Sequence, residues 1–315
     1  MRDFSSDEAF EAISRNIASA GREYSASLEK RMSHIYDAAS LVCFGDGDDV
    51  LRYVCDSDDT SDILSFIPES TPLPLGSSSE FARGISEKNI ENFDRLCFCK
   101  ALAARRAYGF AEISEILLGA GDGAKTAENR KITMLRNAKA GRAFEIFARK
   151  LRGVEPAYED NFNALCQAVS SGDASYAVLP VESSSDGRLD GIYRAMEKYG
   201  LCILMSCTVL SADGETTRFA LAGKAGNADA GKCNKFEIKI SLDSLFDLSV
   251  ILDAAGFFGA GADSVFSLAG MYGRDNTFGI TFDIENADIT GFVIYLSLMF
   301  SQFVTVGIYP HITEE

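Results

Sequence analysis

The chain has 315 residues, 47% of them apolar and 24% charged, a composition typical of a soluble globular protein with room for two or three domains. Its net charge of −16 argues against nucleic acid and against an anionic membrane surface as partners, because both require a basic face. A small anionic metabolite stays possible, since a few arginines are enough to line one pocket.

The metal-binding residue types are few or poorly spaced. The only histidines are His34 and His311, and none of the eight cysteines has zinc-ribbon spacing, so we expect no metal and no cofactor. The chain shows no apolar signal segment at its start and no run of transmembrane length. We therefore expect free, buried thiols and a cytoplasmic protein.

The first part of the chain, residues 1–118, reads as an all-α module. Apolar residues recur every three or four positions from residue 5 to about residue 44, which predicts one long helix, and Ser5 with Glu8 fits a capping box. A loop is expected at 71–79, and a second long helix is predicted from about 86 to 118.

A small, polar stretch at 119–130 reads as a linker, after which strands and helices alternate through 131–224 and predict an α/β domain. The expected strands are Lys131–Leu135, Ala174–Val181, Leu201–Leu210 and Thr217–Ala222. The expected helices are Gly141–Leu151, Asn161–Ser170 and Leu189–Tyr199.

The last part, residues 235–315, has the order strand, helix, strand, strand, helix, strand, which predicts an α+β ferredoxin-like sandwich. The expected strands are Phe236–Ser241, Asp263–Ala269, Thr277–Glu285 and Phe303–Tyr309. The expected helices are Ser244–Ala255, ended by Gly256, and Asp288–Gln302. The apolar run Val293–Phe303 suits either a dimer interface or the core.

Two short signatures lie in the α/β region. The first follows a helix and a strand and consists of Pro180, Val181, Glu182, Ser184 and Gly187, with Ser183 between the acid and the serine. The second is Thr217-Arg218-Phe219. Both resemble the prephenate dehydratase signatures, although that family has asparagine where Ser183 stands. The end of the chain, closing on VGIYP, resembles an ACT domain, and the segment YSASLEKRMSHIYDAASL resembles the first helix of the all-helical chorismate mutases.

The order of these modules is that of the bifunctional chorismate mutase–prephenate dehydratases of phenylalanine biosynthesis. The resemblance implies that Arg218 holds a substrate carboxylate, Thr217 acts on the leaving hydroxyl and Phe219 backs the ring. Glu182, Ser183 and Ser184 would line the same site, and Arg15 and Arg31 would clamp a carboxylate in the helical module. It further implies prephenate or chorismate as ligand, no cofactor, and a homodimer.

The chain also departs from the family pattern. The family's first dehydratase loop is glycine-rich, whereas residues 136–142 here read RNAKAGR. The three cations Arg136, Lys139 and Arg142 would form an anion cradle at a helix start or lie solvated on a loop. Only residues 186–216 separate the two signatures, enough for one helix and one strand, so the family's second lobe is expected to be missing.

The helical and ACT-like modules depart as well. A cation expected in the first helix falls at Ser14, next to Arg15, and a lysine expected later falls at Val42. The positions aligned with the phenylalanine-sensing signatures, 243–245 and 269–272, do not match them, which argues against feedback by phenylalanine. Two functions therefore stay open. One is a prephenate dehydratase with reduced activity, and the other is a noncatalytic relative that binds a metabolite or regulates the aromatic pathway.

Overall fold

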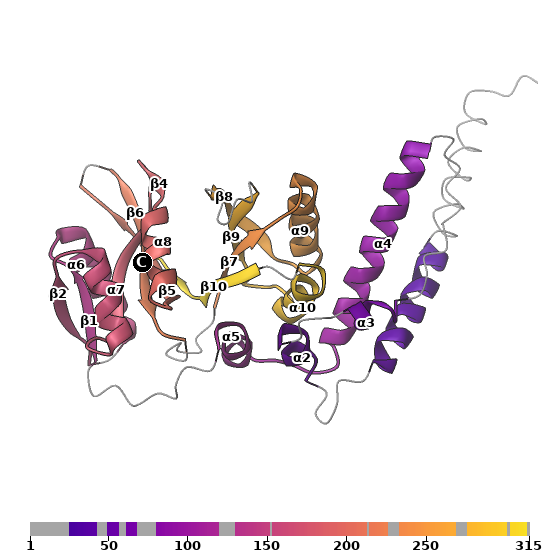
Figure 1. Cartoon of the computed structure of the whole chain (residues 1–315), viewed down its shortest axis with the longest axis horizontal. Helices are drawn as coiled ribbons and strands as arrows, with labels where there is room; N and C mark the ends of the chain where they lie inside the picture. The colour runs from indigo at the N-terminus through magenta and orange to yellow at the C-terminus, as the bar shows by residue number, and fades with distance from the viewer. Residues whose placement is uncertain are drawn as a thin grey trace, which may run out of the picture. The chain divides into compact units, whose positions relative to one another are not determined.

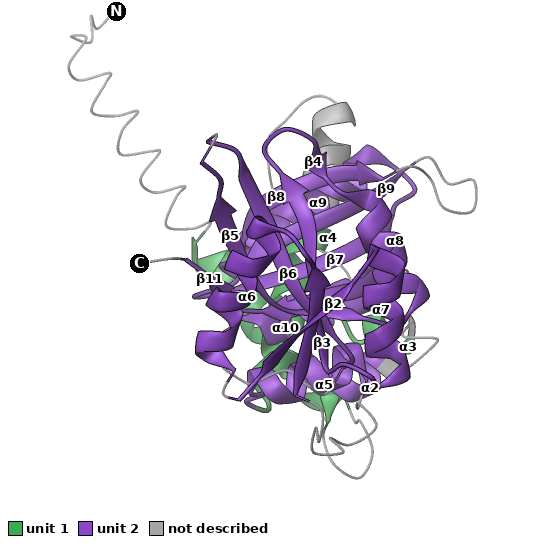
Figure 2. Cartoon of the chain, turned by 90° about the vertical axis from the view of Figure 1, so that its left-hand side faces the viewer, with its two compact units in different colours: residues 1–50, 58–106 green, residues 51–57, 107–315 purple. Residues whose placement is uncertain are grey.

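The computed structural model describes residues 25–42, 49–56, 61–67, 80–119, 130–151, 153–212, 214–225, 233–268, 276–300 and 303–313. The chain divides into two compact units, coloured separately in Figure 2. Unit 1 comprises Met1–Val50 and Asp58–Arg106, and unit 2 comprises Leu51–Ser57 and Ala107–Glu315. The predicted capping box at Ser5, the loop at 71–79 and most of the predicted linker lie outside the described residues.

Unit 1 is helical in its described part. Residues 25–41 form one helix, and α3 (Ser61–Leu64) and α4 (Glu80–Ala103) follow it. The first helix and α4 bury apolar side chains, which is the physical reason for the three-and-four spacing in the sequence. These include Ile35, Ala39, Leu96, Phe98 and Leu102.

The prediction of one continuous helix from 86 to 118 is wrong. α4 ends at Ala103, and a separate helix, α5 (Phe110–Leu118), begins after Gly109, whose backbone is extended. After the break, Arg105 donates from Nη1 to the backbone oxygens of Ala39 at 3.2 Å and Val42 at 2.6 Å. Helix α5 belongs to unit 2, and so does most of α2 (Val50–Asp56), which the sequence pattern did not predict.

Unit 2 is built on one mixed sheet with the strand order β2-β1-β3-β6-β5-β10-β7-β9-β8 (Figure 1). In chain order the strands are β1 Lys131–Leu135, β2 Glu155–Glu159, β3 Tyr176–Ser183, β4 Gly187–Arg188, β5 Cys202–Leu210, β6 Thr216–Gly223, β7 Lys235–Ser241, β8 Gly261–Leu268, β9 Thr277–Asp283, β10 Phe303–Tyr309 and β11 His311–Ile312. β4 pairs with β3 and β11 with β5. All the strands predicted from 131 onward are present.

The α/β half contains β1–β6 and the helices α6 (Ala138–Lys150), α7 (Phe162–Ser171) and α8 (Asp190–Lys198). Asn137 and Asn161 begin α6 and α7, each accepting a hydrogen bond from the backbone three residues on. Two apolar clusters cover the two faces of the sheet: Leu165, Leu179 and Ile203 belong to one, and Phe147, Phe219 and Leu221 to the other. Burial on both faces explains the nearly continuous apolar character of β3 and β5.

The other half has the predicted order β7-α9-β8-β9-α10-β10, and its strand pairs are all antiparallel. Its helices are α9 (Leu245–Phe257) and α10 (Ile289–Met299). Gly256 does not end α9 as predicted, because the helix continues to Phe257 and Gly259, at φ 81°, takes the left-handed conformation beyond it. Val293, Ile294 and Leu296 of α10 are fully buried, so this apolar stretch forms core.

The two halves of unit 2 meet at β5, which pairs with both β10 and β11. β10 runs parallel to β5, with Gly307 opposite Ile203. A side chain at Gly307 would bring a Cβ to 2.5 Å from the Ile203 carbonyl oxygen, so glycine permits this close approach.

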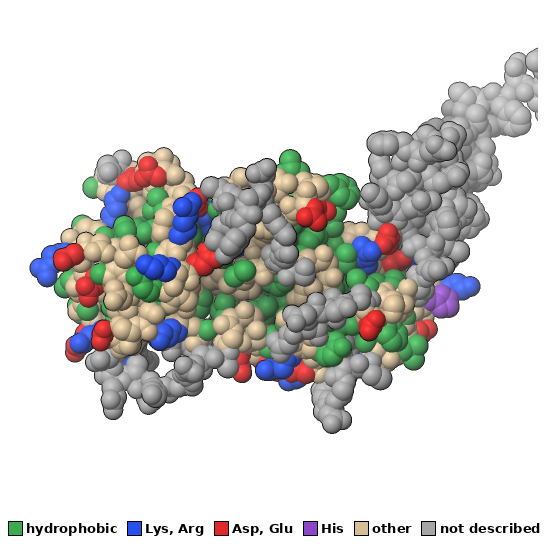
Figure 3. Space-filling model, in the orientation of Figure 1, with side chains coloured by type: hydrophobic (Ala, Val, Ile, Leu, Met, Phe, Trp, Pro, Cys, Tyr) green, Lys and Arg blue, Asp and Glu red, His purple; other side chains and the backbone are tan. Residues whose placement is uncertain are grey.

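On the face shown in Figure 3, described acidic and basic side chains lie intermixed. No described helix is long and apolar enough to cross a membrane.

Candidate functional site

The two sequence signatures meet side by side on strands β3 and β6. In the antiparallel register, Ser183 lies opposite Thr217, and Glu182 lies opposite Arg218. Since successive side chains of a strand point to opposite faces of the sheet, Thr217 and Phe219 share one face while Arg218 lies on the other. The residues implied by the family resemblance are thus divided between two cavities.

The first cavity, here called the Thr217 cavity, has a volume of about 380 Å³. One wall is apolar and partly aromatic, and the polar groups come from the start of α6, the turn after β3 and the start of β6. The lining residues are Leu135, Asn137, Ala138, Lys139, Ala140, Phe162, Val178, Pro180, Ser183, Asp186, Leu189, Glu215, Thr217 and Phe219. An apolar wall with few convergent polar groups is the usual character of a small-molecule site.

Thr217 is central to this cavity. Its side chain is 5% exposed and makes no hydrogen bond with another described residue, although it lines the cavity. A hydroxyl group both donates and accepts, so Thr217 offers both functions to a ligand. Phe219, two residues on, contributes its ring to the same wall.

The cation of the cavity is Lys139, in the first turn of α6. Its ammonium forms an ion pair with Glu215, which also accepts a hydrogen bond from Ser185 Oγ at 2.6 Å. These hydrogen bonds from Lys139 and Ser185 lower the pKa of Glu215, so the carboxylate stays ionised. Of the other cations in the 136–142 loop, Arg136 stacks over the Tyr158 ring at 4.6 Å and Arg142 does not line the cavity.

A tight turn holds Ser183 in place. Its Oγ accepts a hydrogen bond from the backbone nitrogen of Asp186 at 2.9 Å and lies 3.2 Å from an Asp186 carboxylate oxygen. Gly187 follows at φ 68°, a conformation that glycine adopts without strain. The serine in the family's asparagine position is therefore part of an ordered turn that also brings Asp186 to the cavity.

The second cavity, here called the Arg218 cavity, lies on the opposite face of β6 and has a volume of about 480 Å³. It is lined by Glu182, Ser183, Ser184, Thr208, Thr216, Arg218, Lys235, Asp263 and His311. Glu182 and Ser184, both expected at the substrate site, face this cavity instead of lining the Thr217 cavity.

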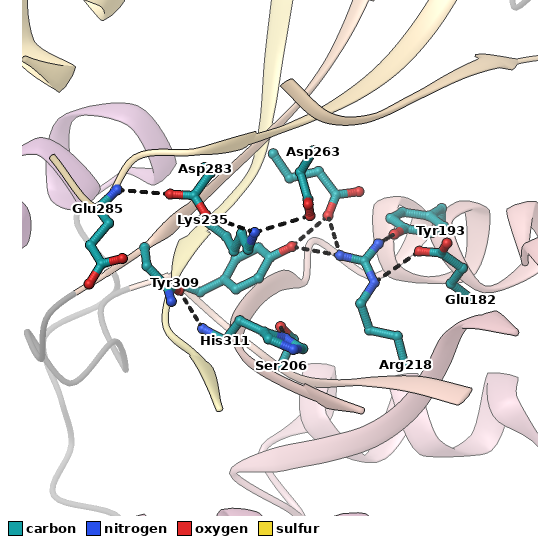
Figure 4. Close-up of polar contacts among 12 residues, drawn as sticks. Glu182, Tyr193, Ser206, Arg218, Lys235, Asp263, Asp283, Glu285, Tyr309 and His311 are labelled. Carbon is teal, nitrogen blue, oxygen red and sulfur yellow. Dashed lines mark hydrogen bonds and ion pairs between the residues drawn. The ribbon is translucent and has the colours of Figure 1, made fainter. Parts of the chain in front are cut away.

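Arg218 is held by a buried polar network (Figure 4). Its Nε lies 3.1 Å from Glu182, and Nη1 and Nη2 donate to the hydroxyls of Tyr309 and Tyr193, both at 3.3 Å. Burial, followed by the nearby Glu237 carboxylate, raises the pKa of Tyr309, which stays protonated and donates to Glu237 at 2.7 Å. Arg218 is thus directed into the protein, where it joins β6 to β7 and β10.

Arg31, expected to clamp a carboxylate in the helical module, lies in unit 1. Its Nε donates to Asp94 at 2.6 Å, and Nη2 pairs with the other carboxylate oxygen. The hydrogen bond to Asp94 raises the pKa of Arg31. Arg15 lies outside the described residues, as does Ser14. In the described ranges the partner of Arg31 is therefore a buried carboxylate of the protein itself.

Sequence reasoning missed several lining groups. Phe162 and Asp186 come from a helix start and a turn, and only the fold brings them to Thr217. Glu215 directly precedes β6 and lies two residues before Thr217. His311 carries no sequence motif, and the pairing of β11 with β5 is what positions it. Across the described ranges no group of three potential metal ligands gathers, and the seven described cysteines are free, six of them buried.

No family model and no curated protein matches the chain. Solved structures match it in part. A prephenate dehydratase from Streptococcus mutans aligns with TM-score 0.49 and 16% identity over 58% of this chain and 99% of that one. A prephenate dehydratase from Arthrobacter aurescens in complex with L-Phe gives 0.45 and 16%, over 57% and 90%. GqqA, described as a novel type of quorum quenching acylase, gives 0.46 and 19%, over 57% and 95%.

Proposed function

We propose that this chain is a prephenate-dehydratase-like lyase that binds its substrate in the Thr217 cavity. The proposal rests on one observation, which is that distant segments of the chain meet at a single cavity. Segments 136–142, 180–187 and 217–219, which align with dehydratase motifs, are up to about 80 residues apart, and each contributes residues to this one cavity. Residues that share a site must line the same cavity, whereas solvated loop residues would lie at unrelated places on the surface.

The cavity suits the chemistry of prephenate, which carries two carboxylates and a hydroxyl on a ring. The Lys139 ammonium supplies a cation for a carboxylate, and Phe219 and Phe162 supply an apolar wall for the ring. In the reaction the ring carboxylate leaves as carbon dioxide, and its bonding electrons make the ring aromatic and expel the ring hydroxyl. That oxygen takes up one proton and departs as water, and the Thr217 hydroxyl donates a hydrogen bond to it.

The cation of this site differs from the one that the family resemblance implied. Arg218 is engaged with Glu182, Tyr309 and Tyr193 on the far face of β6. Lys139 takes its place in the proposal. The Lys139 and Glu215 side chains are 36% and 25% exposed, and an ion pair in contact with solvent is weak. A substrate carboxylate can therefore replace Glu215 as the partner of Lys139.

The test is an assay of the purified full chain with prephenate, following phenylpyruvate, for the wild type and for Thr217→Val. We expect the variant to lose at least about a hundredfold in rate, the usual contribution of a group acting on a departing proton or oxygen. The matched control is Thr281→Val, because Thr281 is a buried β9 threonine whose hydroxyl has no partner among the described residues. Equal loss in both variants would point to damaged folding and contradict the assigned role.

The second candidate function is a noncatalytic binder of the same kind of anion. It is favoured by the inward direction of Arg218, which leaves Lys139 as the cation lining the described part of the cavity. Binding of prephenate without turnover, lost in Lys139→Met when measured by calorimetry, would establish this candidate. Absence of both turnover and binding in a folded protein would exclude both functions.

A further inference from the structure

The Arg218 cavity is a second, separate site by its composition. All nine described lining side chains are polar or charged, in contrast to the apolar wall of the Thr217 cavity. It is built from strands of both halves of unit 2, since Arg218 lies on β6, Lys235 on β7 and Asp263 on β8. Most of its lining is polar, so a hydrophobic ligand group has little apolar surface to bury against.

Charges of both signs alternate around this cavity (Figure 4). Arg218 pairs with Glu182 at 3.1 Å, and Lys235 pairs with Asp263 at 3.1 Å. Both cationic side chains are only 12% exposed, whereas Glu182 and Asp263 are 33% and 48% exposed. The two carboxylates therefore keep open acceptor positions at the cavity, while each cation has further partners behind it: Tyr193, Tyr309 and Asp283.

His311 adds a directed ring nitrogen. Its Nδ1 lies 2.8 Å from Ser206 Oγ, and its backbone nitrogen donates to Asn234 Oδ1 at 2.7 Å, which fixes the residue on β11. Ser206 is fully buried, and His311 is the partner that the described residues give to its hydroxyl. Because Nδ1 contacts Ser206, the second ring nitrogen, Nε2, is the hydrogen-bonding atom that His311 can offer to a ligand in the cavity.

We propose that the Arg218 cavity binds a small hydrophilic zwitterion, with its carboxylate toward His311 and its ammonium toward Glu182 and Asp263. A simple anion would meet two partly exposed carboxylates, and a simple cation would meet Arg218 and Lys235. A ligand with both charges satisfies both sets of groups without breaking the ion pairs between them. The Thr208 and Thr216 hydroxyls then receive the polar remainder of the ligand.

The first experiment is ligand-detected NMR on the full chain carrying Lys139→Met, which removes the cation of the Thr217 cavity, with three probes: L-asparagine, succinate and 1,4-diaminobutane. They carry both charges, only negative charge and only positive charge. We expect saturation transfer to L-asparagine alone at millimolar concentration. No transfer to L-asparagine, or equal transfer to succinate or to the diamine, overturns the proposal.

Variants then locate the binding. Thr208 is exposed and its side chain makes no hydrogen bond with another described residue, so Thr208→Val removes one ligand contact without disturbing a pair. We expect it to weaken L-asparagine binding about fivefold, the effect of one hydrogen bond between neutral groups. His311→Gln should weaken it similarly. Lys139→Met, in the other cavity, should leave it unchanged. Loss in Lys139→Met with retention in Thr208→Val and His311→Gln would place the ligand in the Thr217 cavity and refute the assignment.

Discussion

At the scale of single residues, Glu215 sets how strongly the Thr217 cavity attracts an anion. Its carboxylate already neutralises Lys139, and the hydrogen bonds from Lys139 and Ser185 hold its pKa below the ordinary value. The carboxylate therefore competes with a substrate anion at every pH above that lowered value. Glu215→Gln removes the competing charge but keeps the size of the side chain.

We expect Glu215→Gln to bind prephenate a few-fold more tightly, because a solvent-exposed ion pair is weak and its loss frees Lys139 only modestly. Calorimetry at neutral pH measures this directly. Lys139→Met is the opposite control and should weaken binding. An affinity that falls in both variants would mean that Glu215 contacts the ligand itself rather than competing with it.

His311 makes the stability of unit 2 depend on pH. Burial, followed by Lys235 and Arg218, lowers its pKa from 6.5, while Asp263 acts in the other direction and Glu182 lines the same cavity. The folded protein therefore binds this proton less readily than the unfolded chain. The resulting contribution to stability is complete above the unfolded pKa and declines as the pH falls from there toward the lowered folded pKa.

Urea unfolding at pH values on both sides of about 6.5 tests this linkage. Wild-type stability should fall on the acid side, and His311→Gln should reduce that fall because glutamine does not titrate. His34→Gln serves as the control, since His34 lies in the first helix of unit 1 and not in unit 2. A fall of the same size in wild type and His311→Gln would contradict the assignment.

The sequence predicts which side chains of β6 lie on the same face of the sheet, but it does not predict which residues they contact. Thr217 and Phe219 face one way and Arg218 the other because of the two-residue period of a strand. The partners of Arg218 are Glu182 on the neighbouring strand, Tyr193 on α8 and Tyr309 on β10. That last contact depends on β10 lying beside β5, a pairing that no local pattern reveals.

At the scale of elements, alternation and periodicity predicted strands well where they are buried and failed at boundaries. β2 was missed because its residues EPAYE are mostly exposed and include Pro156, which suits an edge strand and weakens the usual strand signal. The break between α4 and α5 was missed because the apolar spacing continues across it. What ends α4 there is irregular backbone, with Arg105 turned to the carbonyl groups of another helix.

The junction of β5 and β10 depends on Gly307. A Cβ there would come within 2.5 Å of the Ile203 carbonyl oxygen and 2.8 Å of the Tyr309 ring. Because the first of these neighbours is backbone, we expect Gly307→Ala to lower the free energy of unfolding by about 1–3 kcal/mol, the usual cost of overpacking.

Urea unfolding measures that loss, and Gly261→Ala is the matched control. Gly261 also lies on a strand, but a Cβ added there meets nothing within 4 Å. The control should change stability by no more than about 0.5 kcal/mol. Equal effects in the two variants would show that the pairing of β5 with β10 does not require glycine at position 307.

At the scale of the whole molecule, the residues that resemble a dehydratase site and the arginine that resembles a chorismate mutase residue lie in different compact units. Both cavities described above lie in unit 2, whereas Arg31 lies in unit 1. The sequence could not distinguish a substrate-binding Arg31 from a structural one, because its partner Asp94 is 63 residues away on α4. A buried carboxylate at that distance is visible only after the helices are packed.

We expect Arg31→Met to destabilise unit 1 by about 1–3 kcal/mol, because the Asp94 carboxylate, 2% exposed, loses the hydrogen bonds that Arg31 donates to both of its oxygens. Thermal unfolding followed by circular dichroism measures the loss. Arg95→Met is the control, since Arg95 pairs with Glu91 on the exposed surface of α4 and such pairs contribute little. Phenylpyruvate formation from prephenate should persist in both variants as long as unit 2 stays folded. If Arg31→Met instead kept its stability and abolished the conversion of chorismate to prephenate, Arg31 would be a substrate ligand, and the pair with Asp94 would be a resting arrangement that the substrate replaces.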